Sequence, residues 1–355
     1  MGLKLSHEVL RLSLREPFRI ARTDHHTGEG VTTVVVELRD DRHPGIVGVG
    51  EGYPDRFYGE TPETMAAVFP LLMSMANDWF LPDDLDDARQ SIEQVEALFH
   101  TQIRWNGAAK CAIDIALHDL AGKVLGVPVY ELIGLSPAIP PTDFTIGIDE
   151  PAVVAERAKR AAQFPALKIK CGGPDDLATL RAVREVFDGP IRVDANTGWT
   201  REDADRLLPD LVELGVELIE QPFAARAYRD LAWLQERSTV PIVADESAVS
   251  YEDLEALVGV VDGVNVKLAK CGGIAAAKEM LERARELGLR TFLGCMEETS
   301  VGIAGSAAVA SLADWVDLDG CLLLADDPFR GLELGADHRW ILAPGPGLGL
   351  TRMTA

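Results

Sequence analysis

Eight short apolar segments constrain the fold of this chain more than any other feature of its sequence. They lie at 142–147, 166–170, 191–194, 217–220, 242–245, 263–268, 291–294 and 315–319. An amphipathic stretch with helical periodicity separates each segment from the next, which is the pattern of parallel βα units. Eight strands at this spacing predict a (β/α)₈-type barrel, and therefore the α/β fold class.

The residues before the barrel carry a different pattern. Segments of strand-like composition lie at 3–14, 31–38 and 45–52. Helical periodicity then runs from 62 to 125, which indicates an α+β unit of its own. Because Gly and Pro interrupt the pattern near residue 136, we expect one domain at 1–136, completed by the tail at about 326–355. The barrel, at 137–325, is then expected to carry the site.

Two lysines share the second barrel strand, in the segment Ala-Leu-Lys-Ile-Lys-Cys. Residues two apart lie on one face of a strand, so Lys168 and Lys170 point the same way. Their mutual repulsion disfavours the charged forms, and we therefore expect lowered pKa values and a role as a base. A pair of solvated lysines on an edge strand is the alternative interpretation.

Three carboxylates end consecutive barrel strands. Asp194, Glu220 and Asp245 close the third, fourth and fifth strands, at intervals of 26 and 25 residues. The C-terminal ends of barrel strands converge on one site, where unpaired carboxylates would repel one another. Hard oxygen ligands of this kind predict Mg²⁺ or a similar cation. The alternative, that each carboxylate caps the following helix, explains one of them better than all three.

Two further strand ends complete the pattern. Lys267 ends the sixth strand, opposite the second, so Lys170 and Lys267 are expected to face each other across the metal. The eighth strand ends in Asp-Leu-Asp-Gly, where Asp317 and Asp319 share a face. Two more carboxylates beside a metal site need a compensating cation, which a substrate ammonium group would supply. A solvated Lys267 and an Asp-Gly turn are the alternatives.

Composition narrows the class of partner. The net charge of −23 argues against nucleic acid and anionic membranes, which both reward basic patches. The five cysteines lack zinc-site spacing and no signal-peptide pattern is evident, so we expect free thiols and a cytoplasmic protein. No apolar run approaches the roughly 20 residues of a membrane span. A homo-oligomer is also expected.

Several motifs together resemble a known family. The Lys-Ile-Lys pair, Val-Asp-Ala-Asn, Ile-Glu-Gln-Pro, Ala-Asp-Glu-Ser and Asn-Val-Lys-Leu-Ala-Lys-Cys-Gly-Gly are similar to the muconate-lactonizing subgroup of the enolase superfamily. The Asp-Leu-Asp-Gly segment resembles the dipeptide epimerases of the L-Ala-D/L-Glu type in particular. The resemblance implies a (β/α)7β modified TIM barrel with an N-terminal α+β capping domain.

The same resemblance implies roles for the residues singled out above. It places Mg²⁺ on Asp194, Glu220 and Asp245, makes Lys170 and Lys267 the two acid/base catalysts, and makes Lys168 the support of the first. The implied enzyme is a Mg²⁺-dependent isomerase. It inverts the α-carbon of the C-terminal residue of a dipeptide by two-base 1,1-proton transfer through a metal-stabilised enediolate.

The resemblance also implies a cover for the barrel mouth. Residues 20–23 and 57–60 of the capping domain are the candidates for a lid that excludes water. Arg22 suits an anionic substrate side chain and Glu297 a cationic one, and the sequence leaves the choice open. The predicted substrate-binding residues are Asp317, Asp319, Arg22, Glu297, Met296 and Thr142.

Three other functions compete with this interpretation. A muconate cycloisomerase or an o-succinylbenzoate synthase-like lyase uses the same metal and lysines, but its substrate carries no ammonium group for Asp317 and Asp319. An N-acyl amino acid racemase is disfavoured by the same argument. A non-catalytic metal-binding barrel is disfavoured because every predicted acid/base residue is retained.

Overall fold

An eight-stranded parallel sheet lies at the centre of the structure, a computed structural model that describes residues 2–25, 30–77 and 79–353. Its strands are β6 (Phe144–Ile146), β7 (Leu167–Lys170), β8 (Ile191–Asp194), β9 (Val216–Glu220), β10 (Ile242–Ala244), β11 (Gly263–Val266), β12 (Arg290–Leu293) and β13 (Trp315–Val316). They neighbour one another in chain order. A parallel bridge between Thr142 and Val316 also joins the first strand to the last. The predicted barrel fold is confirmed.

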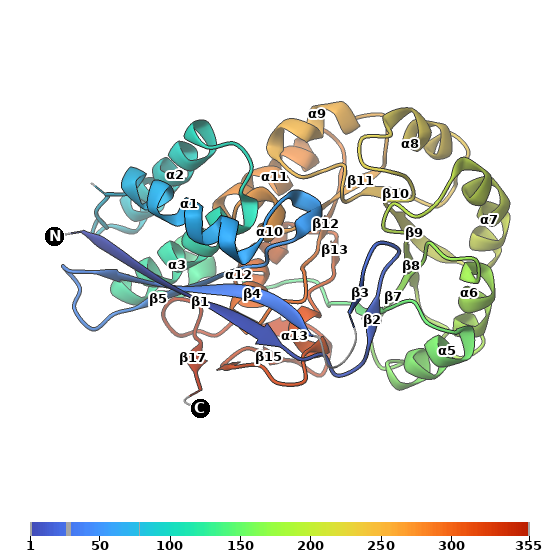
Figure 1. Cartoon of the computed structure of the whole chain (residues 1–355), viewed down its shortest axis with the longest axis horizontal. Helices are drawn as coiled ribbons and strands as arrows, with labels where there is room; N and C mark the ends of the chain where they lie inside the picture. Colours follow the sequence, from blue (N-terminus) through green and yellow to red (C-terminus); the bar gives the residue numbers. More distant parts are fainter. Residues whose placement is uncertain (1, 26–29, 78, 354–355) are drawn as a thin grey trace.

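At least one helix follows each of these strands. These helices are α5 (Pro151–Arg160), α6 (Asp176–Arg184), α7 (Arg201–Glu213), α8 (Tyr228–Gln235), α9 (Leu254–Leu257), α10 (Leu268–Cys271), α11 (Ile274–Glu286), α12 (Ser300–Val309) and α13 (Gly320–Leu323). The longer ones, such as α5, α6, α7 and α8, cover the outside of the sheet (Figure 1). Helix α7 shows how local sequence starts them, because Thr200 and Asp203 form a capping box. Its Leu207 and Leu211 then pack into the barrel core. No helix in the described parts of the chain is both long and apolar enough to span a membrane.

The N-terminal α+β layer, called the cap from here on, flanks the barrel. Its antiparallel sheet, in the order β1-β4-β5, consists of β1 (Leu3–Leu12), β4 (Val31–Asp40) and β5 (Gly48–Gly52). Its helices are α1 (Pro62–Met75), α2 (Leu85–Gln102), α3 (Gly107–Leu125) and α4 (Val129–Leu132). A hairpin of β2 (Phe18–Arg19) and β3 (Asp24–His25) extends from the cap to the barrel, as Figure 1 shows. The predicted N-terminal α+β unit is thus confirmed as part of the fold.

The C-terminal tail returns to the cap. It forms the short strands β14 (Phe329–Arg330), β15 (Glu333–Leu334), β16 (Trp340–Ile341) and β17 (Thr351–Arg352). The backbone of Gly347 exchanges hydrogen bonds with Val127 and Val129, which flank the start of α4. Both chain ends accordingly lie on the cap side in Figure 1. The boundaries at residues 136 and 326 stay predictions.

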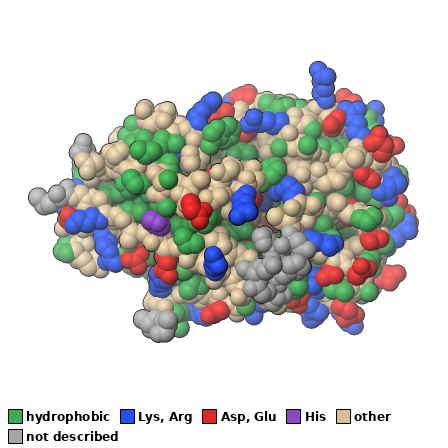
Figure 2. Space-filling model, viewed as in Figure 1, with side chains coloured by type: hydrophobic (Ala, Val, Ile, Leu, Met, Phe, Trp, Pro, Cys, Tyr) green, Lys and Arg blue, Asp and Glu red, His purple; other side chains and the backbone are tan. Residues whose placement is uncertain are grey.

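The surface carries charges of both signs. On the face shown in Figure 2, Lys and Arg side chains alternate with Asp and Glu over the barrel helices.

Three glycines in β5 allow α3 to lie directly against the cap sheet. Gly48, Gly50 and Gly52 alternate along the strand, so all three face the helix. A Cβ atom at Gly50 would lie 2.0 Å from the carbonyl oxygen of Ala112 in α3. The other two glycines meet carbonyl groups of α3 at 2.0 and 2.2 Å in the same way. This close approach fixes the end of β5, which enters the site described below.

The substitution Gly50→Ala should lower the free energy of unfolding by about 1–3 kcal/mol, because the methyl group overlaps the backbone of α3. Urea unfolding measures the change. Gly345→Ala is the matched control: a Cβ atom there meets nothing within 4 Å, so its effect should stay within about 0.5 kcal/mol. Equal effects of the two substitutions would contradict the proposed packing.

Candidate active site

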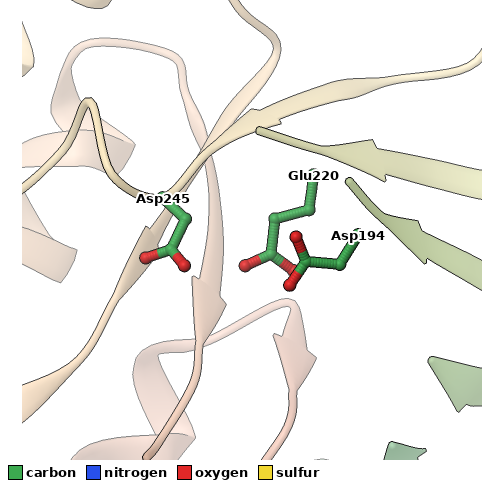
Figure 3. A group of neighbouring side chains, drawn as sticks. All are labelled: Asp194, Glu220 and Asp245. Carbon is green, nitrogen blue, oxygen red and sulfur yellow. The ribbon is translucent and has the colours of Figure 1, made fainter. Parts of the chain in front are cut away.

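The three predicted metal ligands meet at the mouth of the barrel. Asp194 ends β8, Glu220 ends β9 and Asp245 follows β10, and their side chains converge in Figure 3. One oxygen atom from each carboxylate lies within 4.8 Å of the others, and all three residues are buried. Hard oxygen donors at this spacing suit a small divalent cation such as Mg²⁺. The structure therefore brings together the residues that the strand-end pattern predicted.

The predicted catalytic lysines approach this carboxylate group from two directions. Lys170 Nζ, from β7, lies 2.7 Å from Asp194 Oδ2. Lys267 Nζ, directly after β11, lies 2.9 Å from Asp245 Oδ2. Because β8, β9 and β10 separate β7 from β11 in the sheet, the two ammonium groups stand on different sides of the carboxylates. This is the arrangement that the sequence predicted.

Lys168 lies deeper in the barrel. Its Nζ atom is 2.5 Å from Asp317 Oδ2, 2.8 Å from Glu220 Oε2 and 3.6 Å from Asp194 Oδ2. Burial lowers the pKa of Lys168, but these carboxylates more than offset that effect and raise it well above its usual value. The expected lowering of its pKa by Lys170 is therefore wrong.

Lys267 shows the same balance. Burial again lowers its pKa, but Asp245, Glu220 and Asp194 together more than offset that effect and raise it above its usual value. Attraction to carboxylates outweighs repulsion between lysines at this site.

Two residues that hold the carboxylates were not predicted from the sequence. Asn265 Nδ2 donates to Glu220 Oε1 at 2.6 Å. Lys270, which a sequence interpretation would make a solvated surface residue, is buried and donates to Asp245 Oδ1 at 2.5 Å. A signal for Asn265 was present, because it lies two residues before Lys267 and so shares its face of β11. Lys270 follows the strand in α10, where the period of two gives no guidance.

The two aspartates of the eighth strand lie side by side on Thr145 of β6. Asp317 Oδ1 accepts from Thr145 Oγ1 at 3.0 Å, and Asp319 Oδ2 accepts from the Thr145 backbone N–H at 2.6 Å. Burial, together with the charge of Asp317, raises the pKa of Asp319 to about 8. Asp317 already pairs with Lys168, whereas Asp319 has no ion-pair partner among the described residues, and this position suits a cationic ligand group. Thr145 carried no signal in the sequence.

The structure does not bring Thr142 to the cavity. Its hydroxyl group is buried and accepts from the Leu318 backbone N–H at 2.9 Å, between the two aspartates. The substrate-binding role predicted for Thr142 therefore has no support in the described contacts, and Thr145 takes the neighbouring position in the cavity wall. Thr142 lies just before β6, where it forms a bridge to Val316 of β13, and this position is below the mouth of the barrel.

A cavity of about 490 Å³ lies between these residues and the cap. Its barrel wall includes Lys170, Lys267, Met296, Glu297, Asp317 and Asp319. Its cap wall includes Ile20, Arg22, Thr23, Tyr53, Tyr58 and Glu60, so both predicted lid segments reach it. The predicted substrate-binding residues other than Thr142 thus share one cavity.

The charge of Arg22 is already balanced. Its guanidinium group forms an ion pair with Glu246, donates to the Asn196 carbonyl oxygen at 3.1 Å and lies 4.1 Å from the centre of the Phe57 ring. Glu246 directly follows Asp245 and was not predicted. An anionic substrate side chain would have to compete with Glu246 for Arg22, whereas Glu297 lines the cavity together with Tyr53 of the cap.

A second pair of buried carboxylates lies behind Glu297. Glu298 is buried, accepts from the Met296 backbone N–H at 3.3 Å through Oε2, and has no hydrogen-bond partner for Oε1 among the described residues. Burial, followed by the charge of Glu51 in β5, raises the pKa of Glu298 to about 8. Glu298 is therefore neutral over most of the physiological pH range.

Two family models match most of the chain. The model described as "Mandelate racemase / muconate lactonizing enzyme, N-terminal domain" matches residues 6–134. The model described as "Enolase C-terminal domain-like" matches residues 152–353.

Individual proteins are similar over nearly the whole chain. An L-Ala-D/L-Glu epimerase of Bacteroides thetaiotaomicron is 37% identical over 99% of this chain and 88% of its own length. A dipeptide epimerase of Enterococcus faecalis V583, solved with Mg and L-Leu-L-Tyr, matches with a TM-score of 0.88 at 32% identity, over 99% of this chain and all of its own. An N-succinyl Arg/Lys racemase of Bacillus cereus ATCC 14579 matches with a TM-score of 0.88 at 30% identity, over 99% and 96%.

The substitution Glu298→Gln should stabilise the protein increasingly as the pH rises. The pKa of Glu298 is about 8 in the fold against a usual 4.5, so the folded protein binds the proton more tightly than the unfolded chain does between these values. The free energy of unfolding of the wild type then falls by at most about 1.4 kcal/mol per pH unit between these two pKa values because of Glu298, whereas Gln, which does not titrate, causes no such fall. Urea unfolding of both proteins at pH 5 to 9 gives the difference.

The control is Glu286→Gln, at an exposed position in α11, whose difference from wild type should not vary with pH. A pH-independent difference for Glu298→Gln would contradict the raised pKa of Glu298.

Proposed function

We propose that this chain, which belongs to the mandelate racemase and muconate lactonizing enzyme family of the enolase superfamily, is a Mg²⁺-dependent dipeptide epimerase. One observation carries the proposal: the same cavity holds a carboxylate group that suits a metal and a separate aspartate pair, Asp317 and Asp319. A dipeptide has a carboxylate at one end and an ammonium group at the other. It can therefore satisfy both positions at once.

The two lysines carry the reaction. Lys170 and Lys267 stand on different sides of the three metal-binding carboxylates. A substrate whose own carboxylate binds at the metal would therefore present the two faces of its α-carbon to the two lysines. One lysine takes the α-proton of the C-terminal residue, and the other returns a proton to the opposite face, so that the configuration inverts. One lysine must therefore start neutral and the other charged.

Asp194, Glu220 and Asp245 would hold Mg²⁺. When bound, Mg²⁺ neutralises the substrate carboxylate and, because it shares these ligands with the lysines, favours the neutral form of the lysine that accepts the proton. Asn265 and Lys270 keep two of the three carboxylates oriented.

The other polar residues orient the substrate. Lys168 supports Asp317 from below, and Asp319 lies on the Thr145 backbone, so the ammonium group meets a fixed pair of carboxylates. The cap residues Ile20 and Tyr58 close the cavity from above and exclude water.

Side-chain preference follows from the charges that line the cavity. Because Glu246 offsets Arg22, we assign no preference for an anionic side chain to Arg22. Glu297 remains the candidate for contact with a cationic one.

The aspartate pair also argues against the competing functions. An N-acyl amino acid, a muconate or a succinylbenzoate precursor presents no ammonium group, so its binding would leave Asp319 without a cation, while Asp317 would keep only Lys168. We therefore rank the lyases and the N-acyl racemase below the dipeptide epimerase. A cytoplasmic location and a homo-oligomeric state stay predictions.

Incubation of L,L-dipeptides with the protein and Mg²⁺ in D₂O should place deuterium on the α-carbon of the C-terminal residue and produce the L,D isomer, both visible by NMR. Lys170→Ala and Lys267→Ala should each reduce epimerisation by about 10²–10⁴-fold, the usual contribution of an acid/base group.

Lys278→Ala is the matched control, since Lys278 lies on the outer helix α11 and pairs with Glu282. Turnover near the wild-type rate in either active-site variant would refute the two-lysine assignment. No deuterium incorporation by the wild type across a broad dipeptide panel would refute the epimerase itself.

The free amino terminus of the substrate should also be required. N-acetylation of a good dipeptide substrate should lower kcat/KM at least about tenfold, because hydrogen bonds to charged groups contribute about 1.5–3 kcal/mol. Asp319→Asn should lower kcat/KM for the free dipeptide by a similar factor. It should therefore reduce the difference in kcat/KM between the free and the N-acetylated dipeptide. Equal rates for the free and acetylated forms with the wild type would favour an N-acyl racemase.

A further inference from the structure

The segment 295–299 joins β12 to α12 and forms part of the cavity wall. Cys295, Met296 and Glu297 all line the cavity. The Met296 carbonyl group lies against Gly320, where a Cβ atom would be 2.1 Å from its oxygen, and it accepts from the Glu298 backbone N–H at 2.9 Å. One side of the segment is therefore fixed by the residue that follows Asp319.

Glu51 of the cap fixes the other side. Its Oε1 accepts from the Thr299 N–H at 3.0 Å and from Thr33 Oγ1 at 2.8 Å. Its Oε2 accepts from Thr299 Oγ1 at 2.5 Å and from the Gly302 N–H at 2.9 Å. The side chain is fully buried, so no water competes for these donors. A carboxylate at the first turn of α12 is also favoured by the helix dipole.

The same strand end also reaches the cavity. Tyr53 lies two residues after Glu51, is buried, and lines the cavity together with Glu297. Burial and the charge of Glu297 raise the pKa of the Tyr53 hydroxyl group well above its usual value. The end of β5 therefore holds the Thr299 end of the segment 295–299 and lines the same cavity as Glu297.

We propose that Glu51 is a positioning residue: it sets the conformation of the segment 295–299 and thereby the selectivity of the cavity for the substrate side chain. Glu51 does not line the cavity, and it acts through Thr299 on Met296 and Glu297. The effect on selectivity rests on the proposed function, in which dipeptides are the ligands.

Glu51→Gln tests the proposal without changing side-chain volume. The hydroxyl groups of Thr33 and Thr299 can turn to accept from an amide, but the backbone N–H groups of Thr299 and Gly302 cannot. Since these two N–H groups bond to different oxygens of Glu51, one of them loses its acceptor whichever way the amide is oriented.

Two further variants test the barrel side of the contact. Thr299→Val removes the hydroxyl group that bonds to Glu51, whereas Thr299→Ser keeps it. Glu37→Gln is the control for the charge change, because Glu37 lies on the neighbouring strand β4 and pairs with Arg39 at the surface. A melting curve for each variant records any general loss of stability.

Two readouts decide the proposal. Hydrogen exchange, followed by mass spectrometry on peptides covering 294–303, should be about tenfold faster or more in Glu51→Gln and Thr299→Val, because a bond to a charged acceptor is lost. Calorimetry in Mg²⁺ should show that the ratio of Kd values for L-Ala-L-Lys and L-Ala-L-Leu changes at least about fivefold. For active variants, KM should change more than kcat. Thr299→Ser and Glu37→Gln should behave as wild type.

An unchanged Kd ratio in both test variants would overturn the proposal, even with faster exchange, because Glu51 would then be a structural residue only. Unchanged exchange would overturn it as well. Failure of the proposed function is distinguishable: the wild type would bind the dipeptides in calorimetry without epimerising them, while the Kd ratio and the exchange rates would still decide the role of Glu51.

Discussion

The balance of buried charge at the barrel mouth is the constraint on which the rest of the structure depends. Asp194, Glu220 and Asp245 are buried, and unpaired carboxylates there would be costly. Ammonium groups of Lys168, Lys170, Lys267 and Lys270 compensate them, each within 3.0 Å of at least one carboxylate oxygen. Because each lysine is held in place by the backbone of the barrel, a cation or an ammonium group that enters the cavity can bind to the same carboxylates without unfolding the barrel.

The cap stabilises the same region from outside. Gly107, at the start of α3, lies against the backbone of α10, where a Cβ atom would be 2.2 Å from the Lys270 carbonyl oxygen. Asp114, further along α3, accepts from the Ile274 N–H, which directly follows the Cys-Gly-Gly segment at 271–273. In that segment the N–H groups of Gly272 and Gly273 donate to the Leu268 carbonyl oxygen. In the other Cys-Gly-Gly segment, at 171–173, the N–H groups of the two glycines donate to the Asp176 carboxylate. The glycine amides of both segments are therefore already bonded to the protein.

The sequence predicted those parts of the fold and the site that depend on the periodicity of apolar residues and on the spacing between strand ends. The eight strands, and the carboxylates and lysines at their ends, follow from spacing alone. The contacts that the sequence did not reveal join distant residues: Thr145 meets Asp317 across 172 positions, and Arg22 meets Glu246 across 224. The pKa of Lys168 was predicted in the wrong direction for the same reason. Its repulsion from Lys170 is visible in the sequence, whereas its attraction to Asp317, 149 positions away, is not.

The two sides of this cavity differ in how well they should tolerate amino-acid substitution. The reacting side lies inside the barrel, where each carboxylate is paired and a substitution leaves a buried charge without a partner. The side of the cavity that would contact the substrate side chain lies between the cap and the barrel. Its lining residues Arg22, Tyr53 and Glu297 come from the β2–β3 hairpin, the end of β5 and the β12–α12 connection. Glu51 and Glu246 hold parts of this second side without lining the cavity. Substrate preference in such an arrangement can change through the supports of the wall while the charges that perform the chemistry stay in place.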